Sequence, residues 1–364
     1  MSRCTTQRLL TFFCAILPLG LVPDIVEARK ELLSQDEKDQ LRKVERIHLE
    51  LLTLTGKGPV DGAAVQRAAS ERLASLGYRI EDDRAQPADL TVKIKCEELK
   101  TWEGTGRSGG DADMVDAAAR LWKGPACQIT YRSGQRTADW RHEVRTPFAN
   151  PLEAAKKAGQ SDSGIFAIGA LAERIKTDDF PFLLAADLGH VDRLVSALER
   201  PDLTKAQKVT VIGLIGGTQS AEAIPRVTAL TKDTDPDVAA AAATALGTIG
   251  DAGCIPPLLT LMSSDKPDQR RMAAVGLGRL APLYPNSEIV PTLLKALPSE
   301  PVPTQILVVR ALGKTTDRRI LEPLRALHRS VLKRPPGEIT PELAELKSTL
   351  GIALDQFDGT HTEE

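Results

Sequence analysis

Aromatic side chains are scarce in this chain, at 4% of its 364 residues, although 42% of the residues are hydrophobic. A hydrophobic fraction with so few large aromatic groups favours a core of Ala and Leu, as in arrays of packed helices. The formal net charge is only −2. A chain so close to neutral is not built as a whole to coat nucleic acid, so we expect no nucleic-acid partner.

The motifs of common catalytic and metal sites are absent as well. There is no CxxC pair and no cluster of Cys and His, which argues against a structural zinc site. GxSxG and HExxH, the motifs of serine hydrolases and zinc proteases, do not occur. We therefore expect no enzyme, with no catalytic residues, no metal and no cofactor.

No hydrophobic run reaches the roughly 20 residues that a membrane-spanning helix needs. The apolar run from Leu9 to Val22 follows Arg3 and Arg8 and precedes Val26-Glu27-Ala28. This order predicts a cleavable signal peptide over residues 1–28, and the alternative is an uncleaved anchor. We expect a periplasmic or secreted protein that has no membrane span once the signal is removed.

Loss of the signal would leave three cysteines, Cys96, Cys127 and Cys254. Cys96 and Cys127 fall on predicted strands at positions that face the same side, where neighbouring strands bring side chains together. In an oxidising compartment these two residues would form a disulfide and Cys254 would remain a small buried hydrophobe. The alternative is three unreactive thiols.

Residues 29–149 predict a small α+β domain. Apolar and polar residues alternate around residues 47–51, 90–97 and 127–131, and Ser133-Gly134 suggests the turn of a hairpin. Between the first two strands, residues 61–77 have helical spacing. This pattern is typical of a helix on a largely antiparallel sheet. The polar segment 150–180 predicts a linker with one helix.

A period of just over 30 residues organises the remaining chain. Gly216, Gly247, Gly278 and Gly313 are 31, 31 and 35 residues apart, and Pro225, Pro256, Pro291 and Pro323 follow with nearly the same period. Each Gly is predicted to end an Ala- and Leu-rich helix, and each Pro to lie in the first turn of a second helix. Repeated helix pairs of this kind stack into a solenoid with one continuous core.

Three segments carry a family resemblance: Asp235-Pro236-Asp237-Val238-Ala239, Ala245 to Asp251, and Ile255-Pro256-Pro257-Leu258. They resemble the short HEAT-like repeat that is also found in phycobilisome lyases. The resemblance implies an all-α HEAT-like solenoid over residues 181–357, with a C-terminal capping helix and a tail at 358–364. HEAT-like folds that hold two iron ions repeat a His-Glu pair, whereas the one pair here is His142-Glu143 in the predicted sheet domain, so a metal hydroxylase is not expected.

Charge is distributed unevenly along the predicted solenoid. Residues 254–336 contain thirteen Lys and Arg against six Asp and Glu, whereas residues 187–253 contain six against nine. Seven arginines are candidates for a basic surface that binds an acidic partner. They are Arg270, Arg271, Arg279, Arg310, Arg318, Arg319 and Arg325. The alternative is an ordinary solvated face, or one neutralised by the acidic C-terminal residues.

These observations favour a protein-binding scaffold or adaptor outside the cytoplasm, whose partner is a protein. The second hypothesis is an envelope-assembly component in which the sheet domain makes the functional contact and the repeats act as a spacer. An enzyme with an unrecognised site in the sheet domain is the third. The sequence identifies neither the partner nor the surface that binds it.

Overall fold

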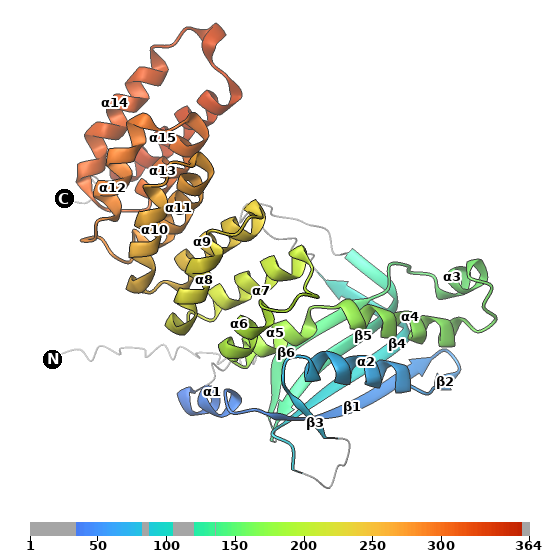
Figure 1. Cartoon of the computed structure of the whole chain (residues 1–364). Coiled ribbons are helices and arrows are strands. Elements are labelled where there is room, and N and C mark those ends of the chain that lie inside the picture. Colours follow the sequence, from blue (N-terminus) through green and yellow to red (C-terminus); the bar gives the residue numbers. More distant parts are fainter. Residues whose placement is uncertain (1–33, 82–86, 105–119, 135, 359–364) are drawn as a thin grey trace, which may run out of the picture.

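A mixed β-sheet forms the first part of the molecule (Figure 1). The computed structural model describes residues 34–81, 87–104, 120–134 and 136–358, so the predicted signal peptide and residues 359–364 of the tail lie outside it. The strand order is β2-β1-β4-β5-β6, and β3 also pairs with β1. The strands are β1 (Arg46–Thr55), β2 (Gly58–Pro59), β3 (Arg79–Glu81), β4 (Leu90–Gly104), β5 (Arg120–Ser133) and β6 (Arg136–Arg145).

The sheet is less antiparallel than the sequence suggested. β1 runs parallel to both β3 and β4, whereas β4, β5 and β6 are antiparallel neighbours. The parallel pairs arise because helix α2 (Ala63–Ala74) carries the chain back along the sheet before β3 and β4 begin. A short helix, α1 (Gln35–Leu41), precedes β1 and starts with the capping box that Ser34 forms with Glu37.

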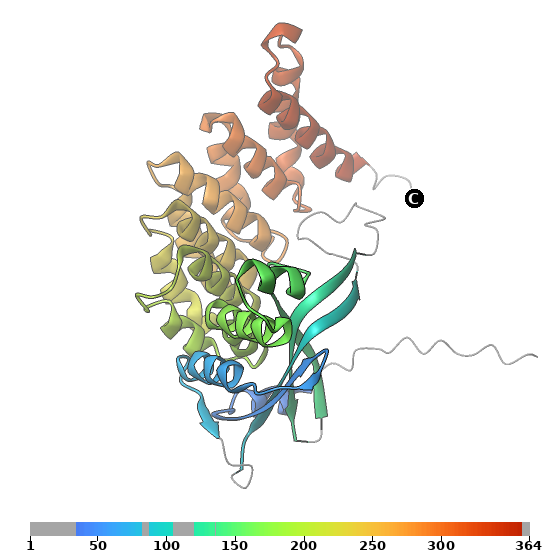
Figure 2. The ribbon, with the colours of Figure 1, turned by 90° about the vertical axis from the view of Figure 1, so that its right-hand side faces the viewer.

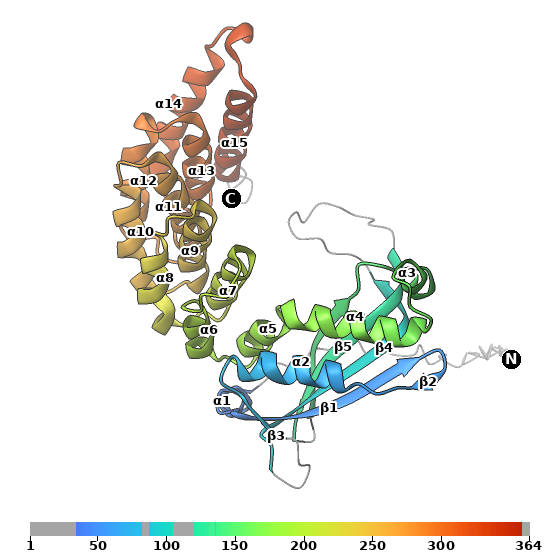
Figure 3. The same cartoon turned by 45° about the vertical axis from the view of Figure 1, so that its right-hand side comes forward.

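Two helices lie side by side over one face of the sheet (Figure 3). One is α2, and the other is α4 (Ser163–Thr177), whose apolar side buries Ile168, Leu171 and Ile175. The segment 150–180 is therefore not a linker with one helix, because it contains α3 (Pro151–Lys157) as well as α4, and α4 belongs to the core of the sheet domain. Its apolar residues recur at helical spacing and need a partner surface, which the sheet supplies.

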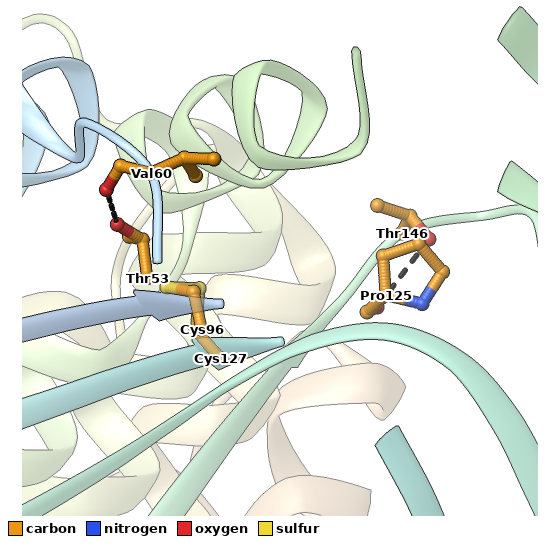
Figure 4. The surroundings of a disulfide bond; sticks show 6 residues. All are labelled: Thr53, Val60, Cys96, Pro125, Cys127 and Thr146. Carbon is orange, nitrogen blue, oxygen red and sulfur yellow. Dashed lines mark hydrogen bonds between the residues drawn. A yellow bond between two sulfur atoms is a disulfide. The ribbon is translucent and has the colours of Figure 1, made fainter. Parts of the chain in front are cut away.

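A disulfide joins Cys96 and Cys127 on the face of the sheet that these helices cover (Figure 4). The two residues lie directly opposite each other on β4 and β5, and neither side chain is accessible to solvent. Cys254 is buried and unpaired in the repeats. A cross-strand bond at this position fixes the register of the two long central strands.

Helix pairs form the rest of the chain, which confirms the predicted fold class of an α+β domain followed by a helical solenoid (Figures 1 and 2). The inner row of helices packs in sequence, α7 on α9, α9 on α11, α11 on α13, and α13 on α15. The inner row is α7 (Lys205–Gly217), α9 (Pro236–Ile249), α11 (Pro267–Leu280), α13 (Val302–Leu312) and α15 (Pro341–Asp358). The outer row is α8 (Ile224–Leu230), α10 (Ile255–Met262), α12 (Ile289–Ala296) and α14 (Leu321–Leu332), in part preceded by short 3-10 turns (Figure 3).

Three of the four periodic glycines act differently from what the sequence suggested, whereas Gly313 follows the end of α13 as predicted. Gly216, Gly247 and Gly278 lie inside their helices instead of after them. Each faces the next inner helix: a Cβ atom on Gly247 would lie 2.6 Å from the carbonyl oxygen of Gly276, and one on Gly278 would lie 2.9 Å from the Cβ of Ala311. The repeat period therefore marks the points of closest backbone approach between inner helices.

The first helix pair attaches the solenoid to the sheet domain. It consists of α5 (Phe180–Asp187) and α6 (Val191–Ala197), and its buried Phe180 and Phe182 belong to a hydrophobic core that continues from the sheet to α15. Polar contacts surround this junction. Arg72 of α2 donates to the carbonyl of Asp178, and its guanidinium lies over the ring of Phe182.

A buried histidine lies at the centre of the junction. His190 is 4% exposed, and its Nδ1 lies 2.7 Å from the hydroxyl of Tyr78 while its Nε2 lies 3.1 Å from the carbonyl oxygen of Leu41. Neutral imidazole satisfies both contacts, with Nε2–H as donor and Nδ1 as acceptor. Burial, with the nearby Arg193, lowers the pKa of His190 below its ordinary value.

Replacing Gly247 with Ala is expected to destabilise the protein by about 1–3 kcal/mol, because the added methyl meets the backbone of Gly276. Gly213→Ala is the matched control, since a Cβ at this exposed position of α7 would touch nothing within 4 Å. That control should stabilise the protein by up to about 1 kcal/mol. Urea denaturation measures the free energy of unfolding of both variants. Equal changes in this free energy would contradict the explanation by close backbone approach.

Acid is expected to weaken the junction through His190. Below pH 6.5, the ordinary pKa of histidine, the unfolded chain binds a proton at this residue that the folded chain does not. The contribution of His190 to the free energy of unfolding is therefore complete above this pH and decreases as the pH falls. His190→Phe should cost about 1–3 kcal/mol near neutral pH but flatten the decline between about pH 7 and pH 5. Denaturation at stepped pH tests this, with His328→Gln on α14 as control. A His190→Phe protein that keeps the parent slope would contradict it.

Candidate interaction surfaces

The seven arginines proposed as one basic surface are divided between the two rows of helices. Arg270, Arg271, Arg279 and Arg310 lie in the inner row on α11 and α13, whereas Arg318, Arg319 and Arg325 lie in the outer row on the turn before α14 and on α14 itself. A basic surface that included all seven would therefore have to extend over both rows of helices.

Arg270 has a structural partner. Its Nε and an Nη lie 2.6 Å and 3.1 Å from the two carboxylate oxygens of Glu300, and another Nη donates to the carbonyl of Ser264. The Glu300 side chain is 3% exposed and that of Arg270 is 19% exposed. A two-point contact of this kind joins the start of α11 to the turn before α13, so Arg270 serves the packing of the repeats.

Most of the other arginines are paired with nearby acids. The pairs are Arg271 with Asp268, Arg310 with Glu345, Arg319 with Asp317, and Arg325 with Glu322. Arg279 donates to the hydroxyl of Thr248, and the exposed Arg318 has no polar partner among the described residues. These acids belong to the solenoid itself, so most of the seven candidate arginines already have an acidic partner within the protein.

The solvent-facing stripe of the inner helices has a different character. Aligned by the repeat period, its two central rows contain no charged residue on α7, α9 or α11, and the first charge in them is Arg310 on α13. One row is Thr210, Ala241, Met272 and Leu307, and the other is Gly213, Thr244 and Val275. These residues are partly or fully exposed, so the inner row presents a surface of uncharged side chains that range in size from Gly213 to Met272 and Leu307.

The sheet face opposite α2 and α4 is polar. Its side chains include Lys93 and Lys95 on β4, and Arg141, Glu143 and Arg145 on β6. A hollow of about 260 Å³ opens here between β4, β5 and β6. It is lined by Lys100, Gln128, Arg141, His142, Glu143 and Arg145.

An ion cluster holds one side of this hollow in place. Glu143 accepts from Lys100 at 3.1 Å and from Nε of Arg145 at 2.6 Å. The Lys100 side chain is only 12% exposed. Arg141 is exposed, and no polar partner of its side chain occurs among the described residues. The cluster thus combines three cations with one carboxylate.

Sequence reasoning missed this cluster for two reasons. Lys100 follows a bulge between Glu97 and Lys100 and lies beyond the predicted strand. Arg141, Glu143 and Arg145 do alternate visibly, but alternation identifies a strand and its polar face without revealing what lies beside that face. His142, which lies between Arg141 and Glu143, points to the opposite, helix-covered face, where its Nε2 lies 2.8 Å from Oδ1 of Asp178.

Two features of other protein classes are missing from the described residues. No group of three or more His, Cys, Asp and Glu side chains there is arranged to hold a metal ion. No helix in the same residues is both long and apolar enough to cross a membrane.

The chain has low similarity to several solved structures. An engineered protein is 21% identical over 50% of this chain and 85% of its own, with a TM-score of 0.35, and a second engineered protein is 20% identical over 57% and 58%, with a TM-score of 0.32. Human deoxyhypusine hydroxylase in complex with glycerol is 15% identical over 51% and 91%, with a TM-score of 0.23. None of the curated proteins matches the chain.

The repeats themselves match a family model. Residues 191–278 fit the model described as HEAT repeats, a segment that extends from α6 to α11. The stacked helix pairs continue the same architecture on the C-terminal side of the match. The chain thus contains HEAT-like repeats over residues 191–278.

Proposed function

We propose that this protein is a scaffold that binds a partner protein outside the cytoplasm. The observation that carries the proposal is the uncharged surface along the inner row of HEAT-like helices. Stacked repeats give a long, preformed surface whose residues need little reordering on binding. HEAT-like repeats are generally protein-interaction scaffolds.

The location outside the cytoplasm is supported by two features. Residues 1–28 have the order of a secretory signal, with basic residues, an apolar run and small residues. The Cys96–Cys127 disulfide is a bond that persists in oxidising compartments and is rare where thiols are kept reduced. A periplasmic or secreted protein accounts for both.

The location has a chemical test. The protein isolated from its native compartment should begin at Arg29 and contain one alkylatable cysteine, Cys254. That thiol should react only after unfolding, because burial raises its pKa to about 11. N-terminal sequencing and mass spectrometry after alkylation measure both properties. A chain that retains Met1, or has Cys96 and Cys127 reduced in that compartment, would count against it.

The inner surface can be tested by adding charge to it. Thr244→Glu with Val275→Glu places two carboxylates in one central row, and desolvating them should weaken partner binding at least about tenfold. The matched control is Ala229→Glu with Thr260→Glu, which adds the same charge to exposed positions of the outer helices α8 and α10.

Quantitative capture of partners from the extracytoplasmic fraction, with the full chain as bait, provides the measurement. A partner lost from the inner pair and retained by the outer pair supports the scaffold surface. A partner retained equally by both would reject it and favour the sheet domain as the working part, with the repeats as a spacer in envelope assembly.

A further inference from the structure

Strand β6 ends the sheet. Within the part of the chain that the structure describes, β5 pairs with one side of β6 and no strand pairs with the other. β6 has ten residues and contains no proline. An edge of this length presents backbone N–H and C=O groups on which an extended segment of another chain can form a further strand.

The hollow described above lies against this edge. Arg141, Glu143 and Arg145 are alternate residues of β6, so all three project to the same, uncovered face. Ala126 lies on that face opposite Arg145 and is fully buried.

Charge determines which segment fits. Charged residues on an edge usually prevent indiscriminate pairing. Here Glu143 is already engaged by Lys100 and Arg145, so the cluster keeps an excess of two positive charges, and Arg141 remains exposed. Acidic side chains would find complementary charge at this edge, and basic ones would be repelled.

We propose that β6 binds an extended acidic segment of a partner protein, which adds a strand to the sheet and places its carboxylates beside Arg141 and Arg145. This site is separate from the inner surface of the solenoid and does not depend on it. The backbone ladder supplies general affinity, and the cluster selects acidic residues at defined spacing.

The spacing follows from strand geometry. Arg141 and Arg145 are four residues apart, about 13 Å along the strand, with Glu143 between them on the same face. The added strand therefore needs two acidic residues four positions apart, with an uncharged residue midway to face Glu143. Two acidic residues three positions apart would point to opposite faces of the sheet.

This requirement allows a test by isomeric peptides with the full-length protein. One nine-residue peptide is Thr-Thr-Glu-Thr-Gln-Thr-Glu-Thr-Thr, which reads the same in both strand directions. Its isomer of identical composition has the two Glu residues three positions apart. By fluorescence anisotropy, the first should bind at least about tenfold more tightly than the second. It should also slow backbone hydrogen exchange in β6.

Two charge reversals complete the test. Arg141→Glu should lower the affinity for the first peptide at least about tenfold. Arg67→Glu, at an exposed position on α2 of the same domain, should leave it unchanged. Equal binding of both isomers, or no binding of either, would overturn the proposal. Displacement of the peptide by inorganic phosphate without any protection of β6 would also overturn it, in favour of a site for small anions.

Discussion

The shared hydrophobic core at the junction is the constraint on which the rest of the structure depends. Helix α4 covers the sheet, and α5 and α6 continue from it, so the first repeat begins on a surface that the sheet domain already fixes. A stack of repeats needs a cap at each end, because the terminal pairs would otherwise expose apolar faces. The sheet domain is that cap at one end and α15 at the other.

Close backbone contact propagates this order along the solenoid. Gly247 and Gly276 allow α9 and α11 to approach until a single methyl group would collide with a carbonyl oxygen. Small residues at such points make the inner row tight and regular. The two central rows of the exposed stripe on the same helices carry no charge from α7 to α11.

The charge that a surface of this protein presents depends more on which side chains form ion pairs than on how many charged residues the sequence contains. The arginine-rich second half of the solenoid holds acids at short range, with Arg270 and Glu300 as the most buried example. The sheet domain, with no comparable signal in its sequence, places Lys100, Arg141 and Arg145 around one carboxylate at an exposed edge. The two candidate surfaces thus differ in chemistry: the inner row suits a neutral partner surface, and the sheet edge suits an acidic strand.

The sequence by itself determined the fold class, the repeat period and the strands that carry Cys96 and Cys127, because these depend on local periodicity and on turn residues close to each other in the chain. Only the tertiary structure decided the role of α4, the partners of the arginines and the positions of His142 and His190. These depend on contacts between residues far apart in sequence, such as His190 with Leu41 and Tyr78. Periodicity tells which face of an element is apolar. What lies against that face follows from how the elements pack together.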